Sequence, residues 1–524
     1  MSRRLSIMGR RLLLAGAVAA WTAQPREAAA QSPSYEYLQA FSSVLNFVRI
    51  NYVDSVGYGE LVRAAIEGTL RSLDPHSRFV SAEEWSRRSA LERGELAIPG
   101  LIIEDVDSAV VVLSVYARSP AERAGVQPGD RVVRVADTTV AGQSAESVEL
   151  RLAGEPGSRV KVGFERGPRL EPDTFSVNLK REYPREFSVA TWTMLDSVTG
   201  YVRLSEFGER AATQLRDALR ELRGKRARQL ILDLRGNPGG IVTEAVDIAS
   251  LFLEKGSVVF RTRGRKASVN EDFITKRDGE FAQPLIVLIN ERSASASEAL
   301  AGSLQDNDRA LIMGRRSFGK ALMQTIFIVM PTQDNVWLTI GRVITPSGRI
   351  IQRRYKGLLY EQYRSLGGRE GAEQDTIQVF RTRNGRPVRG GGGIVPDVAL
   401  PAPSEFPVWW TIAADSGFIE AIADSVAHTL GTDPAAQLSW KTSNIKWETG
   451  LVPPFLSRVR NRLKVAAVTT PDLERMIARI LARRAAEVRW GEETGVELWL
   501  YSDPDIRAAR AHFPRLAELL KPTP

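Results

Sequence analysis

The chain has 524 residues, of which 43% are apolar and 25% are charged, and this ordinary globular composition excludes collagen-like and intrinsically disordered proteins. It has no cysteine, which excludes disulfide scaffolds, zinc–thiolate sites, iron–sulfur clusters and thiol proteases, and its three histidines are too scattered to predict a metal site. The net charge is +9, but residues 1–30 carry +4 of it, so the remainder is a weak electrostatic case for nucleic acid.

The first 30 residues have the three parts of a secretory signal peptide. A basic segment runs through Arg11, an uncharged stretch covers Leu12–Pro25, and Ala28–Ala30 offers a cleavage site before Gln31. The uncharged stretch has about 14 residues, too few to cross a bilayer as a stable helix. We therefore expect an exported, periplasmic or cell-envelope protein; an uncleaved signal that keeps it at the membrane is the alternative.

Two regions of different character follow the signal. Residues 31–95 predict an N-terminal helical region, because apolar residues recur at helical spacing up to the proline at Pro75. Residues 96–182 predict a small β-rich domain, with strands expected at Ala109–Val115, Arg131–Val135 and Val160–Glu165.

Residues 183–400 predict an α/β domain, in which strands alternate with helices. The runs Leu230–Leu234 and Leu285–Ile289 are almost purely apolar, as expected for strands that are buried on both faces. Residues 401–524 predict a helical C-terminal region, which holds six of the ten tryptophans. The chain is thus expected to be an α+β multidomain protein.

The densest group of reactive side chains is the serine-rich segment Asn290–Glu298, between a predicted buried strand and a helix. A serine on such a turn can act as a nucleophile, and the N–H groups at the start of the helix can stabilise an oxyanion. No histidine lies nearby as a base, but Lys320 follows another apolar strand and can act as one if it is desolvated. Alone, each feature has a plainer interpretation, a helix cap for the serines and a surface residue for the lysine.

Two glycine-containing segments need separate interpretation. Gly314–Ala321 matches the phosphate-binding G-x-x-x-x-G-K-[ST] loop except at its last position, where alanine cannot ligate magnesium, and a strand rather than a helix follows, so we reject a nucleotide site. Leu230–Gly240 places an aspartate and an arginine before a glycine-rich turn. This pattern suits the edge of a ligand site, or a tight turn closed by an Asp–Arg ion pair.

Together the ordered motifs of residues 40–400 resemble the C-terminal processing peptidases, also called tail-specific proteases. The matching segments are Tyr52–Asp54, Ser72–Ser77, Ser119–Ala121, Ala124–Gly125, Pro128–Asp130, Asp233–Gly240, Ser293–Glu298, Ser317–Lys320, Thr345–Arg349 and Gly393–Asp397. The resemblance implies an α/β serine-protease core of the ClpP/crotonase type, spanning 183–400.

The resemblance also implies the catalytic residues. Ser295, the middle serine of its run, would be the nucleophile of a Ser–Lys dyad, and Lys320, 25 positions later, would be the base. Gln324 matches a glutamine that helps to position the lysine, and the N–H of Ala296 is the candidate oxyanion donor, together with a glycine that the sequence does not identify. Three further polar residues match supporting positions near the site: Asp233, Arg235 and Glu298.

Residues 96–182 resemble the PDZ domain of that family, a β-sandwich-like module that binds peptide C-termini. Pro99–Ile102 matches its carboxylate-binding loop, so Gly100, Leu101 and Ile102 would supply backbone N–H groups to the carboxylate. The expected partners are proteins with exposed apolar C-termini. Neither a cofactor nor a nucleic acid is expected.

Some positions depart from the family pattern. Ala321 stands where glycine is usual after the lysine, and Val343 and Ile344 replace aromatic residues before Thr345. Beyond residue 400 there is no diagnostic motif, so core support, an adaptor contact and a homo-oligomer contact remain alternative roles for the tail.

Two other functions compete with the protease. One is a catalytically inactive PDZ protein that binds C-terminal peptides without cutting them, although such a protein would need neither Ser295 nor Lys320. The other is a basic nucleic-acid binder that uses Arg381–Arg389; only the basic composition of this segment supports it.

Overall fold

The computed structural model describes residues 33–521 except 94, 107–108, 116–118, 128, 167–171, 184–187, 357–362, 364–377 and 403–405. The predicted signal peptide, residues 1–30, lies outside the described residues. Contacts divide the chain into two compact units, with the boundary between Thr69 and Leu70. None of the helices in the described part is long and apolar enough to cross a membrane.

The first unit consists of helix α1 (Pro33–Asn51) and most of helix α2 (Tyr58–Arg71). Large apolar side chains of α1, including Leu38, Phe41 and Phe47, are exposed.

In the second unit, the turn after α2 leads to strand β1 (Arg78–Val80) and helix α3 (Ala82–Glu92). The carboxylate of Asp74 accepts hydrogen bonds from the backbone N–H groups of His76 and Ser77, both at 2.8 Å, and from the Ser77 hydroxyl at 2.6 Å. This aspartate therefore holds the Asp-Pro-His-Ser turn together.

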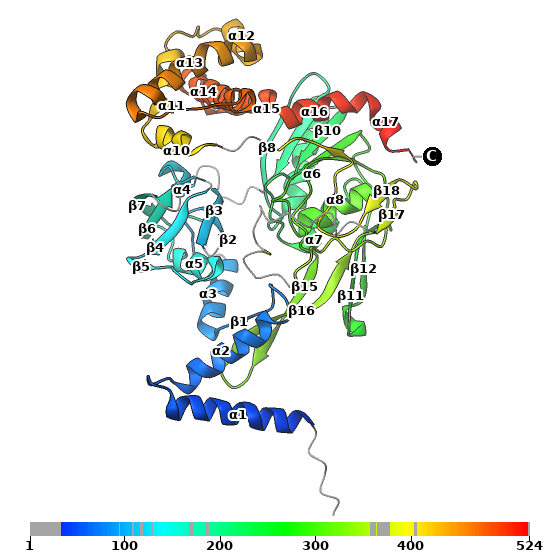
Figure 1. Cartoon of the computed structure of the whole chain (residues 1–524). Coiled ribbons are helices and arrows are strands. Elements are labelled where there is room, and N and C mark those ends of the chain that lie inside the picture. Colours follow the sequence, from blue (N-terminus) through cyan, green and yellow to red (C-terminus); the bar gives the residue numbers. More distant parts are fainter. Residues whose placement is uncertain are drawn as a thin grey trace, which may run out of the picture. The chain divides into compact units, whose positions relative to one another are not determined.

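The predicted PDZ region folds into an antiparallel sheet with its own apolar core (Figure 1). The strand order is β2-β3-β4-β6-β7, with β5 paired to β4, and helix α5 packs beside the sheet. Strand β2, which follows the predicted carboxylate-binding loop, lies at one edge of this order. The elements are β2 (Leu101–Val106), β3 (Ala109–Val115), α4 (Pro120–Arg123), β4 (Arg131–Val135), β5 (Thr138–Thr139), α5 (Ala145–Leu152), β6 (Arg159–Arg166) and β7 (Asp173–Lys180).

A six-stranded sheet forms the centre of the predicted peptidase core, in the order β19-β14-β13-β10-β9-β8. Its strands are parallel except β8, which pairs antiparallel with β9. One face packs against helices α6, α7 and α8. These elements are β8 (Val189–Met194), β9 (Thr199–Leu204), α6 (Ala211–Gly224), β10 (Gln229–Asp233), α7 (Val242–Ala249), β13 (Leu285–Ile289), α8 (Ala296–Asp306), β14 (Leu311–Gly314) and β19 (Val398–Ala399).

A second sheet carries the segment that follows the predicted base. It has the order β1-β16-β11-β12, and β15, which begins two residues after Lys320, pairs with β16. Its remaining members are β11 (Val258–Gly264), β12 (Glu271–Ile274), β15 (Leu322–Val329) and β16 (Asp334–Ile344); the 3-10 turn η1 (Ala267–Val269) and the hairpin β17 (Val379–Arg381) with β18 (Pro387–Arg389) complete this region.

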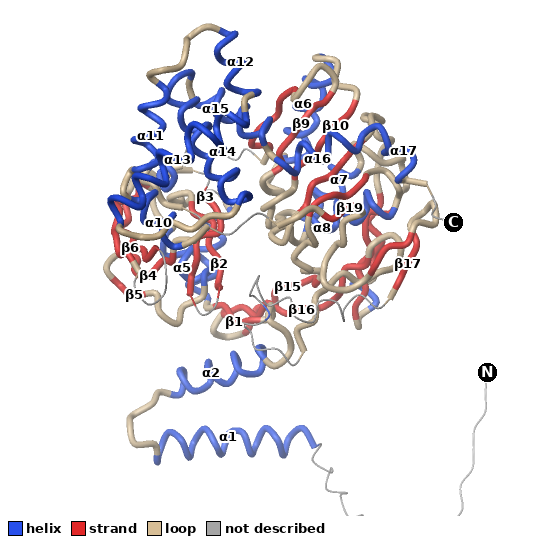
Figure 2. Tube along the Cα trace, turned by 45° about the horizontal axis from the view of Figure 1, so that its top comes forward, coloured by secondary structure: helices blue, strands red, loops and turns tan. Residues whose placement is uncertain are grey.

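The helical C-terminal region divides into two parts. The first is a bundle with its own apolar core, made of α10 (Val408–Asp415), α11 (Phe418–Ala427), α12 (Pro434–Thr442), α13 (Asn444–Leu463) and α14 (Pro471–Trp490). Helix α15 (Glu492–Ser502) packs against α14 of this bundle. The second part, α16 (Pro504–His512), η3 (Phe513–Arg515) and α17 (Leu516–Leu519), runs along the six-stranded sheet (Figures 1 and 2).

This second part covers the other face of the six-stranded sheet. Ile231, Ile286 and Leu288 of the sheet share a buried cluster with Ile506 and Phe513 of the tail. The alternation of side chains along a strand places these residues on the face opposite α6, α7 and α8. The last helices are therefore part of the core of the peptidase domain, which agrees with core support, one of the roles that the sequence left open for the tail.

Candidate active site

The predicted nucleophile lies on the turn between β13 and α8. Ser295 has a φ of +55°, in the left-handed region that a serine rarely adopts, and its side chain is partly exposed. Such conformations are costly and persist where surrounding contacts impose them. Here the backbone N–H of Ser295 donates to Glu298 Oε2 at 2.9 Å.

The two neighbouring serines are engaged elsewhere. Ser293 and Ser297 are fully buried, and their hydroxyls donate to backbone carbonyls, to Leu234 O at 2.8 Å and to Asn237 O at 3.0 Å. Of the three serines in the run, Ser295 alone is open to solvent. This contrast favours Ser295 as the serine that a substrate can reach.

Glu298 connects the segment of the nucleophile to that of the predicted base. Its Oε2 accepts from the N–H of Ser295 and also from the N–H of Lys320, at 2.8 Å. Its Oε1 accepts from the Ser317 hydroxyl and the Gly319 N–H, both at 2.6 Å. Burial raises the pKa of Glu298, these four donors lower it, and the result is about 7.

The glycine-rich loop after β10 packs against the same turn. Asn237 is buried, and its carbonyl accepts from the Ala294 N–H at 3.0 Å. Gly239 has a φ of +103°, and a Cβ at this position would lie 2.9 Å from Ser295 Cβ and 3.0 Å from the nitrogen of Ala296. Only glycine satisfies both the backbone angle and this close approach.

Ala296 is the first residue of α8, where backbone N–H groups have no acceptor within the helix. Because Gly239 has no side chain, space is left beside the nitrogen of Ala296, which suits the predicted role of Ala296 as the oxyanion donor. The N–H groups of Gly236 and Gly239 donate to the side chains of Asn290 and Asn237, both at 2.8 Å.

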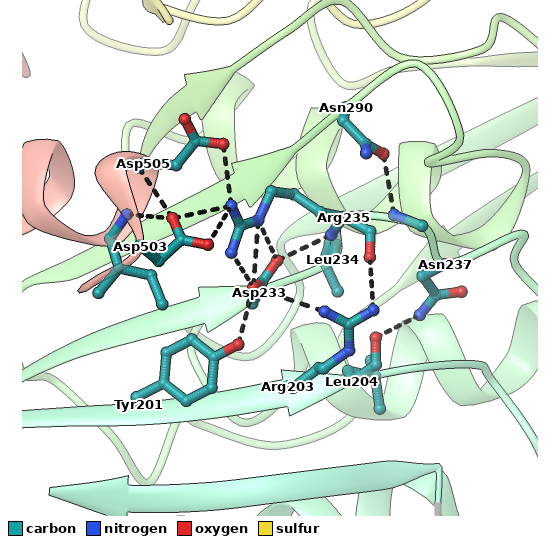
Figure 3. Close-up of polar contacts among 12 residues, drawn as sticks. Tyr201, Arg203, Leu204, Asp233, Leu234, Arg235, Asn237, Asn290, Asp503 and Asp505 are labelled. Atoms are coloured by element: carbon teal, nitrogen blue, oxygen red, sulfur yellow. Dashed lines mark hydrogen bonds and ion pairs between the residues drawn. The ribbon is translucent and has the colours of Figure 1, made fainter. Parts of the chain in front are cut away.

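Asp233 and Arg235 form a buried ion pair behind this loop (Figure 3). Arg235 Nη2 lies 2.7 Å from Asp233 Oδ2, which also accepts from the Tyr201 hydroxyl at 2.8 Å. Burial alone would raise the pKa of Asp233, but the charge and hydrogen bonds of Arg235 bring it down to about 2. The other terminal nitrogen of Arg235, Nη1, forms ion pairs with Asp503 and Asp505 of the tail.

Lys320 and Gln324 line one cavity of about 660 Å³. The PDZ side contributes Ile102 to this cavity, and the tail contributes Trp499. The amide nitrogen of Gln324 donates to the carbonyl of His76, so in this structure the glutamine connects β15 to the Asp-Pro-His-Ser turn. The predicted peptide-binding strand and the predicted base thus open into the same space.

The other predicted PDZ residues lie at the start of β2. Leu101 is buried, and Gly100 has a φ of +90°. A Cβ on Gly100 would lie 2.2 Å from the Cβ of Ser119, so this loop requires glycine.

Two departures from the family pattern are accommodated. Ala321 is buried, and its N–H donates to Gln352 Oε1 at 2.7 Å. Val343, on β16, packs against the core of the peptidase domain. Across the described residues, no three Asp, Glu or His side chains gather in a way that could hold a metal ion.

Sequence reasoning missed several residues that hold the site. Asn237, Gly239 and Ser317 lie inside motifs that were recognised, but their roles depend on contacts between loops. Asp503 and Asp505 had no signal, because their partner Arg235 lies 268 and 270 positions away.

Comparison with known proteins supports this architecture. The model of peptidase family S41 matches residues 198–360, and that of the PDZ domain matches residues 111–166. The carboxy-terminal-processing protease of Bartonella bacilliformis is 33% identical over 326 residues, which cover 61% of this chain and 73% of that protein. The carboxyl-terminal-processing protease of Synechocystis sp. is 32% identical over 297 residues, covering 55% and 68%.

Among solved structures, the photosystem II D1 C-terminal processing protease is similar, with a TM-score of 0.48 and 29% identity over 69% of this chain and 92% of that one. The family matches confirm the resemblance and the fold class predicted from the sequence.

Proposed function

The chain belongs to the carboxy-terminal processing proteases of peptidase family S41 and carries their PDZ domain, and on that premise we propose that it is an exported serine endopeptidase with a Ser295–Lys320 dyad. The observation that carries the proposal is the Glu298 carboxylate, one oxygen of which accepts from the N–H groups of both Ser295 and Lys320. The partial exposure of Ser295 beside two buried serines supports the same assignment.

In the proposed mechanism, the neutral amine of Lys320 takes the proton of the Ser295 hydroxyl as its Oγ attacks a peptide carbonyl carbon. A desolvated site favours the neutral amine. The negative charge that develops on the carbonyl oxygen is stabilised by the N–H of Ala296. The Lys320 ammonium then protonates the leaving amine, and a water molecule, deprotonated by Lys320, hydrolyses the acyl-enzyme.

The proposed substrates are proteins with exposed apolar C-termini. A peptide would add a strand to the edge of β2, with its carboxylate on the N–H groups of Gly100, Leu101 and Ile102. The presence of Ile102 in the lining of the cavity that also holds Lys320 supports the delivery of a bound chain toward the dyad.

We further propose that the protein is exported through its N-terminal signal and works in the periplasm or cell envelope as a chain that begins at Gln31. The composition of residues 1–30 supports this proposal.

A digest of an unfolded protein by the chain from Gln31 onward, with products mapped by mass spectrometry, tests the function. Wild type should make internal cuts, and Ser295→Ala and Lys320→Ala should make none. A wild type that binds peptides with a free C-terminal carboxylate but never cuts them would support the inactive PDZ protein instead. Cuts that persist in Ser295→Ala would refute the dyad.

A further inference from the structure

The junction between α15 and α16 places two buried carboxylates beside the active-site loops. We propose that Asp505, assisted by Asp503, is a positioning residue that fixes the loop packed on the nucleophile relative to the loop that leads to the base. The inference rests on the proposed function, because these loops matter to catalysis only if Ser295 and Lys320 carry it.

One carboxylate oxygen contacts an arginine from each loop. Asp505 Oδ2 lies 2.9 Å from Nη1 of Arg235 and 3.1 Å from Nη1 of Arg315. Arg235 follows β10 and precedes Gly239, the glycine packed on the nucleophile, by four positions. Arg315 follows β14 and precedes Lys320 by five. A shift of Asp505 would therefore move both the loop that packs on Ser295 and the loop that leads to Lys320.

Asp505 is itself held in place by Asp503 and by the packing of α16. Asp503 caps α16 by accepting from the N–H groups of Asp505 at 2.9 Å and Ile506 at 3.1 Å, and its carboxylate also contacts Arg235 (Figure 3). Asp503 and Asp505 are each 7% exposed, and Ile506 is buried against the six-stranded sheet. Charge-assisted hydrogen bonds at such a site are stronger and more directional than those at the surface.

Loss of the Asp505 carboxylate would leave neither arginine without an acceptor. Arg235 keeps Asp233 and Asp503. Arg315 keeps a hydrogen bond to the carbonyl of Pro401 at 3.1 Å and an ion pair with Glu291, at 3.4 Å between Nε and Oε2. The fold should therefore tolerate Asp505→Ala. The variant loses the one acceptor that both loops share, so we expect its kcat to change more than its stability.

The first arm of the test measures peptide hydrolysis. Asp505→Ala should lower kcat by about tenfold or more, because small misplacements of catalytic groups are costly, and should leave KM within about threefold. Asp505→Asn, which keeps one acceptor oxygen, should fall between it and wild type. Glu518→Ala, on α17, breaks an exposed ion pair with Arg515 of η3; this variant is the control and should keep the wild-type kcat.

The second arm does not depend on proteolysis. Amide hydrogen exchange should be about tenfold faster in both 233–240 and 315–321 in Asp505→Ala, and unchanged in Glu518→Ala. Faster exchange in neither loop, or in one alone, would overturn the proposal, as would a kcat within twofold of wild type in an active enzyme. If wild type cuts nothing, the proposed function fails, and the exchange arm still decides whether Asp505 couples the loops.

Discussion

Gly239 stands closest to the chemistry among the residues that only the structure identified. Its φ of +103° disfavours any side chain, and a Cβ there would lie within 3.0 Å of Ser295 and Ala296. Gly239→Ala should lower kcat by at least about 100-fold, the scale of a lost oxyanion donor, measured by steady-state hydrolysis of a peptide substrate.

Gly256→Ala is the matched control for this substitution. Gly256 has a φ of +81°, but a Cβ there would meet no atom within 4 Å, so this variant has similar backbone strain without the clash at the active site. Equal loss of activity in both variants would contradict the assignment of Gly239 to the oxyanion region.

The buried carboxylate of Glu298 makes stability depend on pH. Its pKa is raised from 4.5 to about 7, mainly by burial, so between these values the folded protein keeps a proton that the unfolded chain has lost. This group's contribution to the free energy of unfolding is complete below about pH 4.5 and is lost as the pH rises through 7, by about 3 kcal/mol in all.

Glu298→Gln removes this titration. Chemical denaturation of both proteins should show that the stability advantage of wild type over the variant shrinks by about 2–3 kcal/mol from pH 5 to pH 8. An advantage that is constant or grows with pH would mean that Glu298 is already ionised at pH 5.

At the scale of elements, α16 belongs to the peptidase core although it begins more than 100 residues after the last strand of the sheet, β19. Ile506 is 1% exposed and shares a cluster with sheet residues. Ile506→Ala should lower the free energy of unfolding by about 2–5 kcal/mol in denaturant titrations that follow the peptidase domain.

Leu438→Ala, on α12, gives the comparison. Leu438 is 63% exposed, so its loss should change stability by no more than about 0.5 kcal/mol. A similar small effect for Ile506→Ala would show that the tail is dispensable to the sheet.

The elements around the site follow from local pattern, and the contacts between them do not. Buried strands such as Leu285–Ile289 were predicted with their observed bounds, because a short apolar run between turns has few alternatives. The turn at Ser295 was recognised from its serines. Its pairing with Asn237 and Gly239 depends on two loops from adjacent parallel strands, which a single sequence does not display.

The tail shows the same limit more strongly. Asp503 precedes Pro504 and caps a helix, which a sequence pattern can predict, whereas its ion pair with Arg235 has no local signature. The cover that α16 gives to the sheet was equally hidden, because α16 has the periodicity of any amphipathic helix.

At the scale of the whole chain from residue 70 onward, the PDZ strand β2 and Lys320, the proposed base, line one cavity. A peptide that ends in a free carboxylate should have a KM about tenfold lower than its C-terminal amide, since a charged hydrogen-bonded group is lost in the amide. Gly100→Ala should abolish this difference, because its Cβ would collide with Ser119.

Gly129→Ala is the control within the same domain, with a φ of +101° and open space around its Cβ. It should preserve the preference for a free carboxylate. If wild type cleaved the peptide acid and its C-terminal amide with the same KM, the PDZ domain would not select substrates by their C-terminal carboxylate.

The central claim is that Ser295 is the nucleophile and that Lys320 activates it. Covalent labelling with a serine-reactive organophosphonate, followed by mass spectrometry of the modified peptide, measures this directly. We predict an adduct on Ser295 in wild type and none at the same pH in Lys320→Ala. An adduct on Ser293 or Ser297, or unchanged labelling of Ser295 without Lys320, would contradict the account.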